Sequence, residues 1–386
     1  MKIGIVGGAL QGMEAVFLSK KAGFETLVID RKKTAPALSL SDSKEILDIT
    51  KDENKAKKVL SDCDLVIPAC EEIEALTVLD RMMEDSGKPF LFDLEAYMLS
   101  SSKERSNEIM GEIGIPMPKP WPECGFPVIV KPSSQSGSIG VSAVNSDEEM
   151  KRALNTVKEL KDVPIIQEFV SGKSVSIEVI GNGRSARSLV TTEVILDSNY
   201  DCKMVLCEPN ILPKKDNDMF ADIGRGIAEA IRLKGLMDVE AIFTKNGLKV
   251  LEVDARIPSQ TPAAVWAATD INILEELAFS AMGKSTGRKN RNGCSAYEHF
   301  VIENDSLITC GEKVFGKIAD PKFEERFFGA DEAITDYVPG KEVWRATVIT
   351  KGKDAAEVLR KRKIFIHNLM DECSLDEFID RSPRMV

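Results

Sequence analysis

The residues best suited to chemistry are concentrated in one short stretch, where carboxylates alternate with apolar residues on both sides of a turn. Residues 238–244 and 248–254 flank a turn that ends in Gly247, a pattern typical of a β-hairpin. A three-residue loop with Gly247 in the left-handed conformation would place Glu240 directly opposite Glu252, whereas a two-residue loop would place them on opposite faces. We favour the three-residue loop because of the apolar face that it creates, which comprises Ala241, Phe243, Leu251 and Val253.

The other face of this hairpin would gather acidic side chains next to an arginine: Glu240, Thr244, Glu252, Asp254 and Arg256. Two ionised carboxylates about 5 Å apart repel by about 3 kcal/mol at an effective dielectric constant near 20, so a cation is expected between them. Oxygen ligands without histidine or cysteine suit Mg²⁺ or Mn²⁺ better than zinc. We therefore expect a metal site at Glu240, Glu252 and Asp254, and a solvated acidic face is the alternative.

A loop of small residues between two predicted strands could wrap phosphate oxygens. Residues 133–140 read Ser-Ser-Gln-Ser-Gly-Ser-Ile-Gly and follow a strand that carries Lys131. The loop is not a Walker motif, since no Gly-Lys-Ser/Thr follows, but backbone N–H groups of small residues bind anions and Lys131 adds a positive charge. Residues 167–172 are a strand end that bends into a turn, where backbone groups could contact an adenine edge. Together with the acidic hairpin, this predicts a nucleoside triphosphate with a metal, although Glu168 and Glu178 could equally be solvated strand residues.

The first ninety or so residues alternate short strands and helices, which predicts a parallel, doubly wound sheet. The strands are expected at residues 2–6, 26–30, 44–49 and 64–68, and the helices at 13–22, 52–60 and 73–83. Ligands of such sheets bind beyond the carboxyl ends of the strands. Those ends carry Leu10, Gln11, Glu71 and Glu72.

The glycine-rich turn of residues 7–12 resembles a dinucleotide fingerprint, with Asp30 near the distance expected for a ribose-binding acid. The match is imperfect, because Ala9 replaces the middle glycine that lets the backbone approach a pyrophosphate. An NAD(P)-dependent amino-acid dehydrogenase is therefore an alternative, and it leaves the acidic hairpin unexplained.

A new unit begins after residue 95, where Ser101 and Glu104 have the spacing of a capping box. A proline-rich link at residues 116–122 follows, and the pattern then becomes antiparallel. The predicted domains are an N-terminal Rossmann-like domain at 1–95, a nucleotide- and metal-binding domain at 96–285 and a C-terminal domain at 286–386.

Composition narrows the class of protein. The 386 residues are 43% apolar and 29% charged, as in an ordinary globular protein, and the net charge of -11 argues against nucleic acid as a partner. Nothing resembles a signal peptide or an apolar run of membrane-spanning length, so we expect a cytoplasmic protein without a membrane partner. The eight cysteines contain no Cys-x-x-Cys pair and only two histidines accompany them, which favours free thiols over a zinc site.

The order of these features resembles the ATP-grasp superfamily of carboxylate-amine ligases. The resemblance covers about the first 290 residues and rests on Lys103, Lys131 with its small-residue loop, Glu168-Phe169-Val170, and then Glu240, Glu252, Asp254 and Arg256. It implies an ATP-grasp fold of mixed α/β and α+β class, with an N-terminal doubly wound parallel-sheet domain and a C-terminal domain.

The same resemblance implies a role for each matching residue. Lys103 and Lys131 would hold the phosphates of ATP under the loop around Ser138, and Glu168, Phe169, Val170 and Glu178 would contact the rest of the nucleotide. Glu240 and Glu252 would bridge two Mg²⁺ (or Mn²⁺) ions, with Asp254 where the superfamily usually has asparagine. Arg256 and Lys131 would be the catalytic residues.

Residues 1–11 and 238–258 resemble, more closely, the ligases of pyrrolysine biosynthesis. These enzymes join the carboxylate of (3R)-3-methyl-D-ornithine, or D-ornithine, to the ε-amine of L-lysine through an acyl phosphate, releasing ADP. The expected substrate contacts, each with a structural role as the alternative, are Leu10, Gln11, Glu71, Glu72, Arg225 and Asp238.

Other readings stay open at this point. A purine-pathway or carboxylase-type ATP-grasp ligase is the nearest of them. A binding protein that kept the fold without catalysis would be expected to lack Lys131, Glu240 or Glu252, and all three are present. The sequence leaves a homodimer open.

Overall fold

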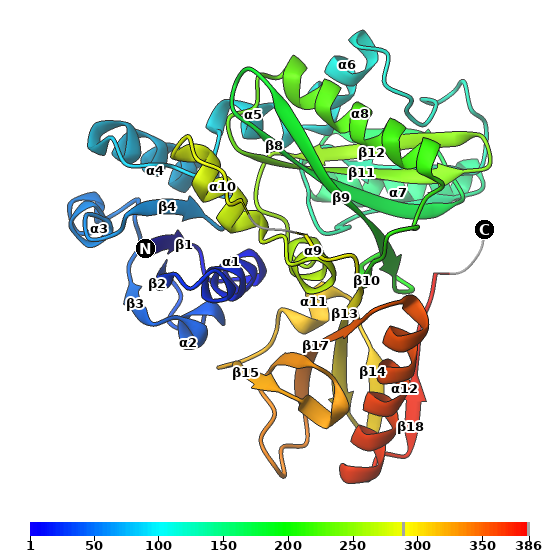
Figure 1. The fold of residues 1–386 in the computed structure, drawn as a ribbon. Helices are drawn as coiled ribbons and strands as arrows, with labels where there is room; N and C mark the ends of the chain where they lie inside the picture. Colours follow the sequence, from blue (N-terminus) through cyan, green and yellow to red (C-terminus); the bar gives the residue numbers. More distant parts are fainter. Residues whose placement is uncertain (288–289, 384–386) are drawn as a thin grey trace. The chain divides into compact units, whose positions relative to one another are not determined.

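The computed structural model describes residues 1–287 and 290–383, and these divide into two compact units (Figure 1). Unit 1 consists of Met1–Leu94, Lys203–Pro209 and Arg256–Arg381, and unit 2 contains Glu95–Cys202 and Asn210–Ala255. The three domains expected from the sequence are a finer division, which stays a prediction.

Unit 1 begins with a parallel four-stranded sheet in the order β3-β2-β1-β4. Its strands are β1 (Lys2–Val6), β2 (Glu25–Asp30), β3 (Ser43–Ile46) and β4 (Leu65–Pro68). Its helices are α1 (Leu10–Lys21), α2 (Ala37–Leu40), α3 (Glu53–Leu60) and α4 (Ile73–Ser86). The predicted doubly wound sheet is confirmed, and the strand order reverses between β1 and β4, where ligands of such sheets bind.

Packing within the chain accounts for the glycine-rich turn after β1. Gly7 has a φ of 111°, and a Cβ added there would lie 2.3 Å from the carbonyl oxygen of Ala69. The carboxylate of Asp30 accepts hydrogen bonds from the backbone N–H groups of Gly8 and Lys32, each at 2.7 Å. The glycines and the aspartate therefore serve the turn itself, which removes the observation that suggested a dehydrogenase.

Unit 2 is built on an antiparallel sheet in the order β12-β11-β8-β9. The strands are β8 (Lys173–Gly181), β9 (Ala186–Leu196), β11 (Leu236–Thr244) and β12 (Gly247–Asp254). Helix α8 (Lys214–Ala230) packs across one face, and its Phe220 and Ile227 share a core with Val179 and Val239 (Figure 1). The opposite face is thereby left for polar residues.

A smaller antiparallel sheet, in the order β6-β5-β7, completes unit 2. Its elements are β5 (Val128–Pro132), β6 (Ser142–Val144), β7 (Pro164–Glu168) and α7 (Asp147–Glu159), and they follow α5 (Leu94–Ser100) and α6 (Lys103–Glu112). Helix α6 is capped by Ser102, which accepts a hydrogen bond from the N–H of Arg105. The predicted capping box at Ser101 was therefore wrong by one residue, although the helix is present.

The C-terminal part of unit 1 has a second sheet and its own core around Phe300, Trp344 and Phe365. The strands are β10 (Cys202–Cys207), β13 (Cys294–Glu303), β14 (Ser306–Thr309), β15 (Lys322–Glu325), β16 (Glu332–Thr335), β17 (Trp344–Gly352) and β18 (Glu377–Ile379). The helices are α9 (Thr261–Thr269), α10 (Ile273–Ala281), α11 (Glu312–Phe315), the short 3₁₀ turn η1 (Phe327–Gly329) and α12 (Ala355–Glu372).

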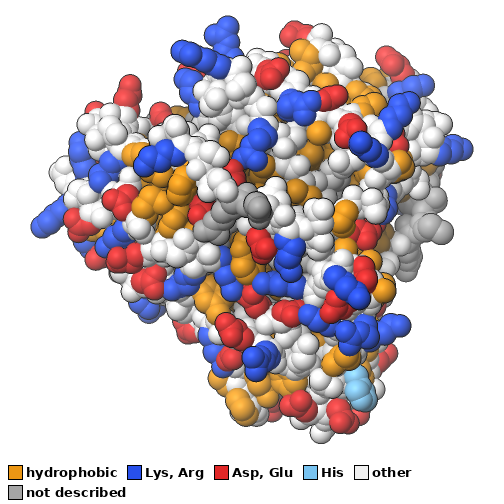
Figure 2. Space-filling view, viewed as in Figure 1, with side chains coloured by type: hydrophobic (Ala, Val, Ile, Leu, Met, Phe, Trp, Pro, Cys, Tyr) orange, Lys and Arg blue, Asp and Glu red, His pale blue; other side chains and the backbone are white. Residues whose placement is uncertain are grey.

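The drawn surface carries no large region of one charge, and the cysteines form no disulfide among the described residues. Acidic and basic side chains are interspersed over the face that Figure 2 draws, so its charge is mixed rather than of one sign. All eight cysteines are free thiols, as the sequence predicted. Within residues 1–287 and 290–383, none of the helices combines the length and the apolar character that crossing a membrane requires.

Candidate active site

The β11–β12 hairpin places Glu240 opposite Glu252, as the sequence predicted, but by a different route. Thr244 pairs with Gly247, so the loop has two residues rather than the predicted three. The extra residue is Leu251, which forms a β-bulge and restores the Glu240–Glu252 pairing. The predicted pair is confirmed, and the predicted loop length was wrong.

The bulge also changes which residues of β12 face the core. Leu248, Val250 and Val253 are buried in the core under α8, whereas Leu251, predicted on the apolar face, is only partly buried and lies outside that core. The carbonyl oxygen of Leu251 instead accepts a hydrogen bond from Nζ of Lys131 at 3.1 Å. The irregularity in the strand thus supplies an oxygen that helps to hold a lysine of the site.

The acidic face extends over three strands. Glu178 on β8 lies opposite Asp238 on β11, which in turn lies opposite Asp254 on β12. With Glu240 and Glu252 this places five carboxylates on one face of the sheet, and Glu178 and Asp238 are 0% and 6% exposed. Buried carboxylates in such a row require nearby cations or donors.

Two lysines of the same unit contact this acidic face. Nζ of Lys103, at the start of α6, lies 3.1 Å from Oε2 of Glu252, and Nζ of Lys131, on β5, lies 3.8 Å from the same oxygen. Their side chains are only 13% and 8% exposed. Burial lowers the pKa of Lys103, but attraction to Glu252, Asp254 and Glu240 outweighs it and raises the pKa, whereas burial prevails at Lys131 and lowers its pKa.

The small-residue loop is attached to the same helix start. Nζ of Lys103 donates to the carbonyl oxygen of Gln135 at 2.8 Å, and the N–H of Lys103 donates to the carbonyl oxygen of Ser133 at 3.0 Å. Ser138 has a φ of 56° and its hydroxyl donates to the carbonyl oxygen of Tyr200 at 2.6 Å. The loop is thus held near Lys103, where its backbone could contact an anion bound by that lysine.

A pocket of about 420 Å³ lies at the end of β7 and is lined by Glu168–Gly172, Phe243–Asn246 and Lys249. Burial raises the pKa of Glu168, but hydrogen bonds from Nζ of Lys249 at 2.5 Å and the N–H of Lys119 at 3.1 Å outweigh it and lower the pKa. A Cβ added at Gly172 would lie 2.3 Å from the carbonyl oxygen of Phe243. The segment predicted to read adenine does line a pocket, while Glu178 is not among its lining residues.

Sequence analysis missed the contribution of the hairpin loop to this pocket. Phe243, Lys245, Asn246 and Lys249 carry no motif, and only the pairing of β11 with β8 brings their strand beside the end of β7. The signal that could have found them is the hairpin turn itself, because residues next to a turn lie at a sheet end.

A separate polar cluster lies within unit 1, at the carboxyl ends of β1 and β4. The amide nitrogen of Gln11 donates to Oε1 of Glu71 at 2.7 Å, and Nε of Arg256 lies 2.9 Å from the same oxygen. The amide oxygen of Gln11 is buried and, within the described part of the chain, has no hydrogen-bond partner. The arrangement leaves an acceptor for an incoming donor beside a carboxylate and a guanidinium.

The remaining predicted substrate contacts lie elsewhere. Glu72 pairs with Arg31 at 2.9 Å, with both side chains well exposed. Arg225 pairs with Asp222 on α8, the helix that covers the apolar face of the unit 2 sheet. Leu10 opens α1 next to Gln11. The structure therefore groups Gln11 and Glu71 with Arg256, and it does not bring Arg225 to the acidic face.

Within residues 1–287 and 290–383, no three His, Cys, Asp or Glu side chains are arranged to hold a metal ion by themselves. Glu240 and Glu252 nevertheless offer paired oxygen donors of the kind that Mg²⁺ prefers, and Mg²⁺ is commonly bound by one or two carboxylates together with substrate phosphates. The donor set therefore fits a magnesium ion that arrives with a nucleotide.

The chain matches the model of the ATP-grasp domain over residues 100–260. The solved biotin carboxylase of Campylobacter jejuni, a β-γ-ATP complex, superposes with a TM-score of 0.73 at 15% identity, covering 95% of this chain and 91% of that one. That likeness shows the fold, and it confirms the predicted ATP-grasp architecture.

Two curated relatives are both named 3-methyl-D-ornithine–L-lysine ligase. The relative from Methanosarcina acetivorans is 34% identical over 95% of this chain and 97% of its own length. The relative from Methanosarcina mazei is 38% identical over 80% of this chain and 81% of its own length. With the ATP-grasp domain and the site described above, these matches show that the chain belongs to the 3-methyl-D-ornithine–L-lysine ligase family of ATP-grasp enzymes.

Proposed function

We propose that the protein uses ATP to join the carboxylate of (3R)-3-methyl-D-ornithine to the ε-amine of L-lysine, a step of pyrrolysine biosynthesis. The observation that carries this proposal is the convergence of Lys103 and Lys131 on Glu252, within an acidic face that includes Glu240. Such an arrangement suits a triphosphate that brings a divalent cation, and phosphoryl transfer depends on that positioning and neutralisation.

The nucleotide would occupy unit 2. Its base would enter the pocket between residues 168–172 and the β11–β12 turn, where backbone groups of Phe169 and Val170 would offer polar contacts. Its phosphates would take over Lys103 and Lys131 from Glu252, with the loop around Ser138 above them.

Glu240, Glu252 and Asp254 would hold magnesium, and we propose two ions because five carboxylates share this face of the sheet. When bound, magnesium would supply neutralisation of the charge that develops on the transferred phosphoryl group. The chain's own part is to place these carboxylates on one face and to release Glu252 from the lysines.

The carboxylate of the ornithine-type substrate would attack the γ-phosphorus of ATP, which forms an acyl phosphate and releases ADP. The ε-amine of lysine would then attack the acyl carbon and displace phosphate, which forms the amide. Arg256 would stabilise the oxyanion of that second step, and Glu71 would orient its guanidinium. The attacking amine must be neutral, because an ammonium has no free electron pair.

The cluster around Gln11 suits the ammonium group of an amino-acid substrate. An ammonium has three donors, which match the buried amide oxygen of Gln11 and the carboxylate of Glu71. Within unit 2, Asp238 accepts a hydrogen bond from the hydroxyl of Ser176, and its role as a substrate contact stays a proposal of its own. The free thiols fit a reducing compartment, and we propose that the enzyme works in the cytoplasm.

The test is ADP release measured over a panel of amino-acid pairs, with mass analysis of the product. We expect 3-methyl-D-ornithine or D-ornithine with L-lysine to give ADP and amide in equal amounts. Replacing L-lysine by L-norleucine, which lacks the ε-amine, should prevent amide formation. Faster ADP release with bicarbonate or formate than with the ornithine-type acid would reject the proposal in favour of a carboxylase or purine-pathway type.

A further inference from the structure

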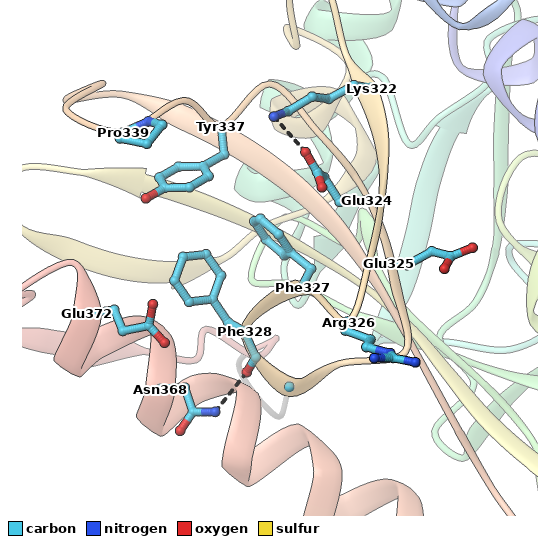
Figure 3. A pocket seen from close by; sticks show the side chains of 11 residues that line it. Lys322, Glu324, Glu325, Arg326, Phe327, Phe328, Tyr337, Pro339, Asn368 and Glu372 are labelled. Carbon is cyan, nitrogen blue, oxygen red and sulfur yellow. Dashed lines mark hydrogen bonds and ion pairs between the residues drawn. The ribbon is translucent and has the colours of Figure 1, made fainter.

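A second pocket lies in the C-terminal part of unit 1 and shares no residue with the sites described above. Its volume is about 490 Å³, within the range typical of small-molecule pockets. It is formed by the end of β15, the turn η1, the segment after β16 and the last turns of α12 (Figure 3).

One wall of this pocket is aromatic. The ring centroids of Phe328 and Tyr337 lie 5.5 Å apart with an interplanar angle of 67°, and Figure 3 shows the two rings side by side. Both side chains are only partly buried. Aromatic faces attract organic cations within about 6 Å of the ring centre and also cover aliphatic chains.

The backbone that presents Phe328 is strained. Phe328 has φ 48° and ψ 30°, and Arg326 has φ 55° and ψ 36°, left-handed conformations that residues other than glycine rarely adopt. The amide nitrogen of Asn368, on α12, donates to the carbonyl oxygen of Phe328 at 3.1 Å and holds the turn. Strain of this kind persists where the position of a side chain matters, and here it fixes a ring at the pocket wall.

The C-terminal end of α12, which lines the pocket with the exposed Glu372, is negative. Helix α12 ends at Glu372, and its last turn contains Asp371 and Glu372 without a basic residue. Helix carbonyl groups already make a C-terminus negative, so acids there are unfavourable unless a cation is nearby. On the far side, Lys322 is paired with Glu324 at 2.6 Å, and Figure 3 shows Arg326 pointing away from the aromatic wall.

We propose that this pocket binds a primary alkylammonium group with an aliphatic stem. Glu372 and the carbonyl end of α12 would face the ammonium, while Phe328 and Tyr337 would contact the stem. A free diamino acid and the lysine side chain of another copy of this chain both have this chemistry. The site is separate from the ligase chemistry, and its test does not depend on turnover.

The test uses fluorine NMR of protein labelled with 3-fluorotyrosine. The chain has four tyrosines, and Tyr337→Phe identifies the resonance of Tyr337. We expect 1,5-diaminopentane and L-lysine to shift this resonance saturably. L-norleucine, which keeps the aliphatic stem and the α-ammonium but lacks the ammonium at the end of the stem, should leave it unchanged. Glu372→Gln should weaken binding about tenfold, because it removes the facing charge.

Asp371→Asn is the matched control. It removes the same charge from the neighbouring residue, which does not line the pocket, so binding should stay within about twofold. Sedimentation of the same variants distinguishes the two sources of the ammonium. If the ammonium comes from another copy, Glu372→Gln should dissociate an oligomer that Asp371→Asn leaves intact. The proposal is overturned if no cation shifts the Tyr337 resonance and Glu372→Gln leaves the sedimentation coefficient unchanged, or if L-norleucine shifts the resonance as strongly as L-lysine.

Discussion

Neutralising Glu252 by the substitution Glu252→Gln tests the electrostatic balance of the site. Lys103 and Lys131 lie 3.1 and 3.8 Å from Glu252, which corresponds to about 5 and 4 kcal/mol of Coulomb attraction at an effective dielectric constant near 20. Repulsion between the two lysines, repulsion from Glu240 and the loss of hydration oppose this attraction. We expect the ligand-free variant to lose about 2 kcal/mol in free energy of unfolding.

Urea denaturation measures this loss, and calorimetric titration with ADP in the presence of Mg²⁺ measures the consequence for function. The variant should stay folded and bind magnesium nucleotide at least about 100-fold more weakly, since a charged ligand of the ion is gone. The matched control is Glu193→Gln, which removes the 2.8 Å ion pair of Glu193 with Lys173 from the same unit. It should cost less than about 1 kcal/mol and leave nucleotide binding unchanged. Magnesium-dependent affinity within about threefold of the unsubstituted protein would refute the reasoning.

Three further outcomes are expected. Gly172→Ala should weaken ADP binding about tenfold or more in a titration, because its Cβ would lie 2.3 Å from a backbone oxygen at the pocket. The control Gly226→Ala, in open space on α8, should leave binding unchanged and stabilise the fold slightly. Burial raises the pKa of Glu14 to about 8, above its value in the unfolded chain, so the free energy of unfolding should fall as the pH rises from about 4.5 through 8. Glu14→Gln should reduce that fall by a few kcal/mol in urea titrations at pH 5 to 9. An unchanged dependence of the free energy of unfolding on pH would contradict this. Arg256→Lys should lower kcat by about 10²-fold with little change in KM for ATP, and Glu71→Gln should lower kcat less in the same assay; loss confined to KM would contradict an oxyanion role.

Local patterns in the sequence predicted the parts of the fold that local physics determines. The alternation of strands and helices before residue 90 identified the parallel sheet, and the hairpin pattern around Gly247 identified β11 and β12. The Glu240–Glu252 pairing was predicted correctly from a wrong loop length. The loop is one residue shorter than predicted, and the bulge at Leu251 restores the register. Bulges leave little trace in composition, so hydrophobic alternation alone cannot locate them.

The rest of the site depends on the path of the chain. Which strand lies beside β11 cannot be read from β11 itself, so the alignment of Glu178 with Asp238 required the structure. The contact between Glu71 and Arg256 joins residues far apart in sequence. Such contacts follow from packing, whereas the residue types and their spacing were enough to identify the ATP-grasp resemblance.

A crystal structure with magnesium and a non-hydrolysable ATP analogue tests the central claim most directly. We predict the base in the pocket beside Phe243 and Lys249, the phosphates on Lys103 and Lys131, and magnesium on Glu240 and Glu252. A nucleotide seated instead on the glycine-rich turn after β1, with the β11–β12 carboxylates still bound to the lysines, would contradict it.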